Sequence, residues 1–515
     1  MVKNSLGREI PEVFNGKNYT PYKDPRSIKP ETLQIRRASR MLKRNYSGNS
    51  KVVGGLREAI IASGLKDGMT ISTHHHLRNG DRLLNDLVKE IDALGLRDIK
   101  IASSSVHIVH AELIPYIRKG VITALECGVN GPIGEQISKG ELDCPIIVRS
   151  HGGRARSVIS GEVPIDVAFM AAPYCDEYGN FNGFYGPSAC GSLGYALVDT
   201  QYARKVVAVT DNLVPFPALP ISVPQNVVDI VAKVDTLGDP KKIVSSTTKL
   251  TKDPMGLQIA KYAAMVIESS GYLENGFSFQ TGTGGISLAV AGHVRDMMRA
   301  KKIKGSFGCG GITGFFVDML DEGLFEGLFD VQCFDLKAVE SIGRNRKHQE
   351  MSAGLYANPF NLGAVVNRLD CAILSATEID VNFNVNVNTE SSGLLLHNTG
   401  GHCDVANGAK VSIIVCPSIR GRLPMVRDEV TTITTPGETV GVVITERGIA
   451  VNDHLPDLKA ELIRRRAPVK DIHQLRDEIY AVTGAPRPVE FTDKVVGLIE
   501  YLDGTIIDTV KTVRA

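Results

Sequence analysis

The chain repeats itself over a long interval, and this internal repeat restricts its fold more than any other feature. Residues 165–183 (IDVAFMAAPYCDEYGNFNG) match residues 369–387 (LDCAILSATEIDVNFNVNV), 204 positions later. Asp166, Asp176 and Asn180 fall on identical residue types, and apolar positions fall on apolar positions between them. Solenoid repeats are only ~20–50 residues long, so we expect two tandem copies of one domain.

Each copy alternates candidate strands with candidate helices. This order is typical of an α/β fold, and we predict that each copy forms a mainly parallel sheet flanked by helices. We place a basic extension at residues 1–50, a first module at 51–240, and a second module with C-terminal helices and a hairpin at 250–515. The extension carries eleven Lys or Arg and four Asp or Glu, and it is either a docking arm or a solvated tail.

The composition argues against several function classes. The net charge of +1 gives no overall field for nucleic acid or for an anionic membrane. The sequence has no apolar run of 18 or more residues. Nine cysteines form no C-x-x-C pair, which favours buried thiols in the cytoplasm. His74, His75 and His76 are consecutive and point in different directions, so we expect no metal site there.

Polar and glycine-rich segments follow several candidate strands. Ligands of parallel α/β sheets bind beyond the carboxyl ends of the strands. In the first copy, the loop with His75 and Arg78 and the segment 150–154 (SHGGR) lie at such ends. In the second copy, residues 281–285 (TGTGG) join a strand to a helix. Such a junction presents backbone N–H groups to an anion, although it matches no complete nucleotide motif.

The two copies differ most at these strand ends. Gly400 and Gly401 align with Tyr195 and Ala196, so the second copy has glycines where the first has side chains. The second copy therefore offers backbone donors for a developing oxyanion, and the first offers polar side chains. We expect a cleft between the modules, with the reacting carbonyl held by the second module.

Two acids are candidates for catalysis. Glu378 and Glu446 both stand in apolar strand contexts, where burial would raise the pKa of a carboxyl group. Each is equally well explained as an acid that accepts hydrogen bonds from backbone N–H groups at a strand end. The sequence has no G-x-S-x-G nucleophile elbow and no Cys/His pair with a recognisable spacing.

Several segments together resemble a known family. In chain order they are SSSVHIVHAELI, IVRSHGGRARSV, FSFQTGTGGISLAV, CGGITGFFVDM, EIDVNFNVN and GGHCDVA. From about Leu56 to the C-terminal hairpin, the chain is similar to the α subunits of citrate lyase, within the CoA-transferase superfamily. The resemblance implies two CoA-transferase-like modules and a citrate–acyl carrier protein transferase that also accepts CoA and contributes to citrate lyase activity. Citrate would displace acetate from an acetyl thioester, giving a citryl thioester.

The resemblance also implies substrates, partners and site residues. The substrate is acetyl-CoA or the phosphoribosyl-dephospho-CoA arm of a carrier protein, with no covalently bound cofactor. The implied partners are the β (citryl lyase) and γ (acyl carrier protein) subunits, citrate and acetate, in a homo-oligomer within a larger complex. A tricarboxylate calls for cations, for which Arg149 and Arg156 are further choices. The site candidates are Gly400, Gly401 and Glu378 for catalysis; Gly282, Thr283, Gly284, Gly285, His402, Asp404 and Glu446 for the thioester or CoA; and His75, Arg78, Ser150 and Arg154 for citrate.

One departure from the superfamily bears on the mechanism. Many members carry a nucleophilic glutamate shortly after the second-module glycine loop, whereas residues 305–314 here read GSFGCGGITG and hold no acid. We therefore expect direct transfer in a ternary complex through a mixed citric–acetic anhydride. The alternatives are a stand-alone acyl-CoA transferase or hydrolase that uses Glu378 covalently, and a non-catalytic docking scaffold.

Overall fold

The computed structural model describes residues 1–24, 50–244 and 250–514. Most of the basic stretch that we regarded as a docking arm or tail lies outside the described residues. Among the described residues, no helix is long and apolar enough to cross a membrane.

The first module is built on a parallel sheet whose central seven strands run β10-β9-β8-β7-β11-β14-β16. All neighbours among them pair in parallel. The helices that carry or support the site are α2 (Leu83–Ala93), α5 (His151–Ser160) and α6 (Gly194–Tyr202). The strands are β7 (Thr70–Ser72), β8 (Ile99–Ile101), β9 (Ile122–Leu125), β10 (Ile146–Arg149), β11 (Val167–Ala171), β14 (Lys205–Thr210) and β16 (Ile230–Lys233).

The second module repeats this strand order as β20-β19-β18-β17-β21-β24-β28. Its helices include α7 (Pro254–Ser269), α8 (Gly285–Lys301), α10 (Leu336–Arg344), α11 (Ala353–Ala357) and α12 (His402–Gly408). The strands are β17 (Ser278–Thr281), β18 (Gly305–Ile312), β19 (Phe325–Cys333), β20 (His348–Glu350), β21 (Cys371–Ser375), β24 (Val411–Val415) and β28 (Val442–Thr445). The shared order of the strands confirms two copies of one α/β module.

The segment that revealed the repeat forms the same small sheet twice. In each copy the first strand pairs antiparallel with the second and parallel with a third. Asp176 and Asp380 each accept hydrogen bonds from the backbone N–H groups two and four residues later, and from an asparagine side chain. Both turns include a residue with positive φ, Gly179 at 92° and Phe383 at 64°. The repeated Asp and Asn residues therefore form a turn and not a catalytic group. The six strands are β12 (Tyr174–Asp176), β13 (Phe181–Asn182), β15 (Leu213–Val214), β22 (Glu378–Asp380), β23 (Val385–Asn386) and β27 (Val426–Arg427).

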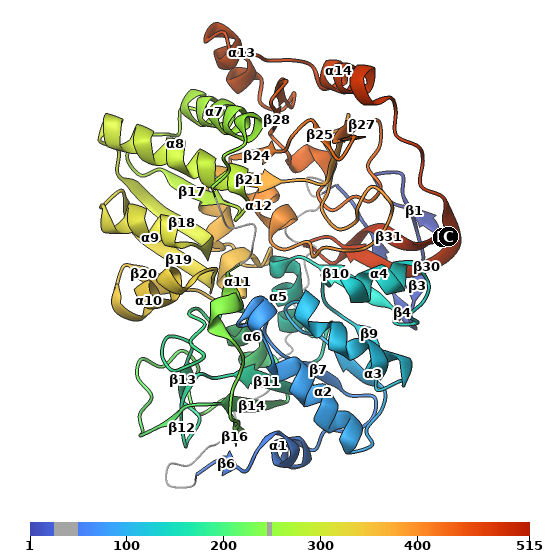
Figure 1. Ribbon diagram of the computed structural model, residues 1–515, viewed down its shortest axis with the longest axis vertical. Helices are drawn as coiled ribbons and strands as arrows, with labels where there is room; N and C mark the ends of the chain where they lie inside the picture. The colour runs from blue at the N-terminus through green and yellow to red at the C-terminus, as the bar shows by residue number, and fades with distance from the viewer. Residues whose placement is uncertain (25–49, 245–249, 515) are drawn as a thin grey trace.

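The C-terminal hairpin lies on the first sheet, not on the second module with which the sequence grouped it. β30 (Phe491–Glu500) pairs in parallel with β10, and β31 (Thr505–Val513) continues the sheet to the N-terminal β5 (Thr20–Pro21). In Figure 1 the red hairpin and the dark blue N-terminal strands lie together beside the first module. The edge of a sheet can pair with any strand that reaches it. The sequence of the hairpin alone therefore does not show which sheet it joins.

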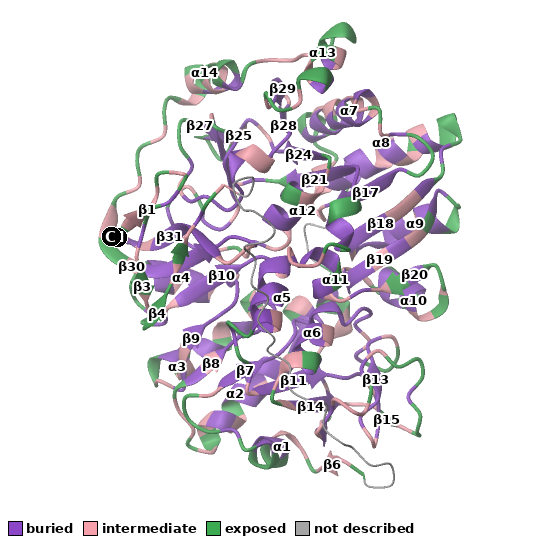
Figure 2. Cartoon of the chain, turned by 180° about the vertical axis from the view of Figure 1, so that it is seen from behind, coloured by how far each residue is buried: buried purple, intermediate pink, exposed green. Residues whose placement is uncertain are grey.

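The carboxyl ends of both sheets face the junction between the modules. Helices α5 and α6 of the first module and α11 and α12 of the second lie at this junction (Figure 1). Figure 2 shows that buried residues continue through it from one module to the other. Gly152 illustrates how close the packing is, because a Cβ there would lie 2.0 Å from the carbonyl oxygen of Ala357. Strand-end side chains from the two copies thus share one site.

Candidate functional site

His75 connects the two modules at the carboxyl ends of β7 and β19. Its Nε2 lies 2.7 Å from the amide oxygen of Gln332, and Gln332 donates back to the His75 carbonyl at 3.1 Å. Because the amide oxygen only accepts, Nε2 carries the proton and Nδ1 accepts from the Ser104 hydroxyl at 2.5 Å. His75 is therefore held in one tautomer at the junction.

An aromatic cluster surrounds His75. Its ring centroid lies 5.1 Å from that of His107, 4.9 Å from that of Tyr195 and 6.3 Å from that of His151. Burial lowers the pKa of His107 and of His151 to about 3, with smaller effects from neighbouring positive groups. These imidazoles are therefore neutral at physiological pH and act as hydrogen-bond donors or acceptors without carrying charge.

Arg78 supplies an unpaired positive charge next to this cluster. Its guanidinium lies over the Phe334 ring, 4.8 Å from the centroid. The backbone of Arg78 has a φ of 55°. Its Nη1 is buried and has no hydrogen-bond partner among the described residues, and the same holds for Nε2 of His107. Burial lowers the pKa of Arg78 from its ordinary value. A buried donor without a partner is costly, and an anionic ligand would satisfy both groups.

Ser150 and Asp404 join the N-terminus of α5 to α12. The Ser150 hydroxyl donates to one Asp404 oxygen at 2.7 Å, and the Gly152 N–H donates to the other at 2.9 Å. The His151 N–H donates to the carbonyl oxygen of Gly400 at 2.9 Å. Burial raises the pKa of Asp404 to about 7. Both side chains are fully buried, so we assign them to positioning the glycine pair and not to direct contact with citrate or CoA.

The other arginines that we proposed for citrate are occupied by the fold. Arg154 forms two hydrogen bonds with Asp199, at 2.9 and 2.8 Å, and donates to two backbone carbonyls. Arg149 and Arg156 both pair with Glu500 on the C-terminal hairpin. We therefore withdraw Arg154, Arg149 and Arg156 as citrate ligands, because moving them would leave buried carboxylates without partners.

The glycine segment 282–285 connects β17 to α8 and is half-exposed. Gly284 is the residue immediately before this 17-residue helix, so Thr283, Gly284 and Gly285 lie at its positive end. A Cβ at Gly282 or Gly284 would meet nothing closer than 3.5 Å. Packing therefore does not require glycine at either position, and close approach of a ligand to the backbone explains it better.

The glycine pair lies where α12 begins. Gly400 has a φ of 61°, which favours glycine, and a Cβ on Gly401 would lie 2.8 Å from the Tyr356 hydroxyl. His402 is not free, since its Nδ1 pairs with the Thr435 hydroxyl at 2.7 Å and its Nε2 with the Ser375 carbonyl at 2.8 Å. We therefore reassign His402 from the thioester to fixing this loop against the end of β21.

Glu378 is fully buried, and both oxygens of its carboxylate have partners. Its carboxylate pairs with Arg427 at 2.7 Å and accepts from the Asn386 side chain at 3.0 Å. The backbone N–H and the hydroxyl of Thr431 complete the set at 2.7 and 3.0 Å. An acid held in this way is not available to attack a thioester, and we withdraw it as a catalytic residue.

Glu446 remains at the carboxyl edge of the second sheet. It follows β28, is half-exposed, and accepts hydrogen bonds from both the backbone N–H and the hydroxyl of Ser418. Its place near the ends of β21 and β24 is consistent with a role along the path of the thioester arm, which stays a prediction.

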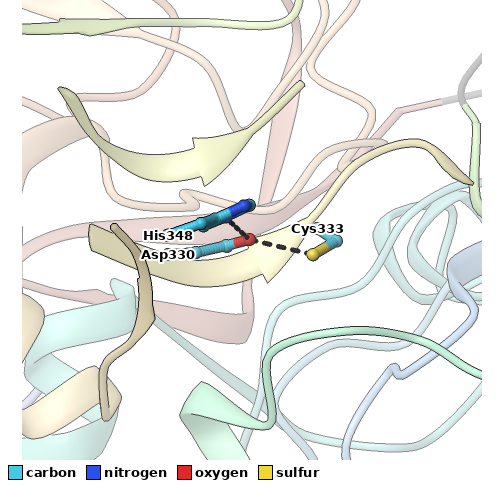
Figure 3. Close-up of side chains that lie close together, drawn as sticks. All are labelled: Asp330, Cys333 and His348. Carbon is cyan, nitrogen blue, oxygen red and sulfur yellow. Dashed lines mark hydrogen bonds and ion pairs between the residues drawn. The ribbon is translucent and has the colours of Figure 1, made fainter. Parts of the chain in front are cut away.

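One buried cluster has residue types that bind metals. Asp330 accepts from the thiol of Cys333 at 2.9 Å and pairs with Nε2 of His348 at 3.1 Å (Figure 3). Burial raises the pKa of Cys333 well above its ordinary value, so it is a neutral thiol, whereas metals bind the thiolate. Hydrogen bonds to one Asp330 oxygen join the three groups, and the other oxygen, Oδ1, has no partner among the described residues. Our expectation of no metal remains a prediction.

The sequence-based prediction omitted four residues that the structure brings together. They are His107, His151, Tyr195 and Gln332, each at or just beyond the carboxyl end of a strand or at a helix start. Three of them were within segments already singled out, and His107 is the fifth residue of SSSVHIVHAELI. His151 is the second residue of SHGGR, and Tyr195 is the first-copy counterpart of Gly400.

The comparisons with known proteins agree over nearly the whole chain. Residues 49–513 match the family model for the citrate lyase alpha subunit (CitF). The chain is 48% identical to the citrate lyase alpha chain of Escherichia coli over 465 residues, 90% of this chain and 91% of that one. It is 47% identical to the citrate lyase alpha chain of Klebsiella pneumoniae, over 90% and 92% of the two chains.

Solved structures give the same result. A structure described as the alpha subunit of citrate lyase from Streptococcus mutans, in complex with citrate, superposes with a TM-score of 0.95. It is 46% identical and covers 99% of this chain and 100% of that one. A Pseudomonas malonate decarboxylase, 15% identical with a TM-score of 0.62 over 84% and 86% of the chains, shares the fold alone. The chain belongs to the citrate lyase α-subunit family.

Proposed function

We propose that the chain transfers the thiol of an acyl carrier protein, or of CoA, from an acetyl thioester to citrate, releasing acetate. The observation that carries this proposal is the position of Arg78 at the junction. Its unpartnered Nη1 and the unpartnered Nε2 of His107 lie beside neutral imidazoles, and the Arg78 guanidinium reaches the second module at Phe334. Together these donors suit a carboxylate-rich ligand.

The thioester is assigned to the second module. Backbone N–H groups at the start of α8 suit the phosphates of a CoA-like arm, and Gly400, where a Cβ would meet only His151 Nε2 at 3.9 Å, leaves room for the acyl carbonyl. Exchange of one thioester for another is nearly balanced in free energy. Much of the rate would therefore come from holding a citrate carboxylate against the thioester carbonyl.

Transfer is direct, through a mixed anhydride within a ternary complex. Two observations support this. Residues 305–314 contain no acid and include all of β18, and the carboxylate of Glu378 is buried with four hydrogen-bonding contacts. Neither segment offers a nucleophilic carboxylate for a covalent enzyme–CoA intermediate.

The proposal extends to the surroundings of the chain. A carrier protein (γ) presents the thioester, and a lyase subunit (β) consumes the citryl product. Several copies of the chain assemble within this complex, and the chain itself needs no covalently bound cofactor. We place it in the cytoplasm, because all nine cysteines are free and buried, as in reduced proteins.

The test uses the purified full chain with acetyl-CoA and citrate. Wild type should form citryl-CoA and acetate. Arg78→Gln should raise KM for citrate at least about tenfold, as expected for loss of a charge-assisted contact worth about 1.5–3 kcal/mol. Arg82→Gln is the control, because that side chain is 60% exposed and pairs with Asp86 on the surface.

Two further outcomes would contradict the proposal. If the wild-type chain forms no citryl-CoA, alone or with its partner subunits, the transferase assignment fails. If borohydride inactivates the enzyme after incubation with acetyl-CoA and leaves a reduced glutamate, direct transfer fails and a covalent route replaces it.

A further inference from the structure

His151 lies between the two halves of the proposed site. It is the first residue of α5, directly after Ser150, which caps the helix by accepting from the Gly153 N–H. On one side its ring stacks on His75 at 6.3 Å and contacts Tyr195 at 4.8 Å. On the other side its Nε2 lies 3.9 Å from the position that a Cβ on Gly400 would occupy. The ring therefore reaches from the citrate side to the glycine pair.

The ring of His151 is available for a ligand. The residue is half-buried, and among the described residues its side chain makes ring contacts but no hydrogen bond. The backbone is fixed by its hydrogen bond to Gly400, and the neighbouring Ser150 and Gly152 are fixed by Asp404. The backbone around His151 is thus fixed by hydrogen bonds, while its ring nitrogen has no hydrogen-bond partner in the part of the chain that the structure describes. Such a donor is preorganised for a substrate atom.

We propose that His151 is a catalytic residue whose Nε2–H donates a hydrogen bond to the carbonyl oxygen of the thioester as negative charge develops on it. This assignment rests on the proposed transferase function. Burial and the nearby Arg154 lower the pKa of His151 to about 3, so the ring is neutral and stabilises the oxyanion without transferring a proton. The groups near its ring are Arg154 on its own helix, His75, His107 and Tyr195.

The steps balance without a proton transfer. A carboxylate oxygen of citrate attacks the acetyl carbonyl carbon, and the carbonyl electron pair moves to oxygen. The tetrahedral intermediate then collapses, the C–S bond breaks, and a thiolate leaves a mixed anhydride behind. The thiolate attacks the citryl carbonyl of this anhydride, and the C–O bond to acetate breaks. His151 donates to the oxyanion in both tetrahedral intermediates.

Two variants of the full chain test this role. His151→Ala should lower kcat about 10²–10³-fold, the usual loss for an oxyanion donor, with KM for citrate and for acetyl-CoA within about threefold of wild type. His151→Gln should retain much more activity than the alanine variant, because its amide N–H donates from a similar position. His473→Ala is the matched control, since His473 is exposed on α14 (Ile472–Thr483).

The outcomes separate this proposal from the function on which it rests. A wild-type chain without transferase activity would contradict both. If wild type is active and His151→Ala keeps its kcat, the role of His151 is wrong and the transferase function stands. If both variants lose activity equally and raise KM for citrate, His151 binds citrate and is not an oxyanion donor. Denaturant midpoints close to that of wild type would show that the variants are folded.

Discussion

At the scale of single residues, glycine occurs at the second-module positions for different physical reasons. A Cβ on Gly282 or Gly284 would make only ordinary van der Waals contacts, so packing does not require glycine there, which points to a ligand. Gly401 instead makes room for the Tyr356 hydroxyl, which accepts a hydrogen bond from the Gln280 side chain at 2.8 Å. The comparison of the two copies explained Gly401 by exposure of its backbone to a ligand, and packing against Tyr356 also requires glycine there.

A pair of substitutions separates these two explanations for Gly401. Gly401→Ala should place a methyl group against the Tyr356 hydroxyl, lower the free energy of unfolding by about 1–3 kcal/mol and reduce kcat at least tenfold. Adding Tyr356→Phe removes the hydroxyl, and the next ring atom lies 3.3 Å from the new methyl. The double variant should regain most of the lost stability and activity in denaturant unfolding and transferase assays.

Gly54→Ala provides the control, because a Cβ there first meets Glu58 at 3.5 Å. If the double variant remains as inactive as Gly401→Ala while regaining stability, the backbone of Gly401 itself touches the substrate.

At the scale of elements, what the sequence could show depended on how local the signal was. The repeat, the mainly parallel sheets and the strand-end loops all followed from patterns within short segments. The pairing of Arg154 with Asp199 could not be predicted in this way, because it joins α5 to α6 across 45 positions. In the sequence, an arginine at a strand end looks the same whether or not an acid pairs with it in the fold. The hairpin β30–β31 likewise shows its own turn but not the sheet edge that it joins.

The element β22 provides a clear test of the covalent alternative. Glu378→Gln should leave the buried Arg427 without a countercharge and lower the free energy of unfolding by about 3–5 kcal/mol. Folded enzyme should keep its kcat, measured per folded molecule at low temperature. Glu340→Gln, at a side chain that is 64% exposed, should change neither quantity. Loss of activity in a stably folded Glu378→Gln chain would restore this acid as a nucleophile.

At the scale of the whole molecule, the junction gathers buried titratable groups. Asp404 joins α12 to α5, and Glu350 accepts from the backbone N–H of Leu193 across the same junction. Burial raises the pKa of both acids to about 7. In the folded state these two carboxyls bind protons that the unfolded chain releases above about pH 4, so they favour folding at low pH. The neutral histidines around them act in the opposite direction.

Around the junction the histidines outnumber these two acids, so we expect stability to fall on acidification. Burial lowers the pKa of His74, His107 and His151 to about 3 and that of His402 to about 4. Unfolded histidine has a pKa of about 6.5, so below that pH the unfolded chain binds protons that the folded chain excludes. The stability from these histidines is complete above about pH 6.5 and is lost as the pH falls towards 4.

The free energy of unfolding should therefore fall on acidification from pH 6.5 to 5, by about 1.4 kcal/mol per pH unit for each net proton taken up. Urea unfolding at pH 7.5, 6.5, 5.5 and 5.0 measures this slope. His402→Gln should flatten the slope by up to one proton, because the amide keeps a neutral donor and acceptor, whereas the exposed His473→Ala should leave it unchanged. Stability that is constant or rises over this interval would show that the histidines are charged in the folded chain, and the neutral role proposed for His151 would fall with it.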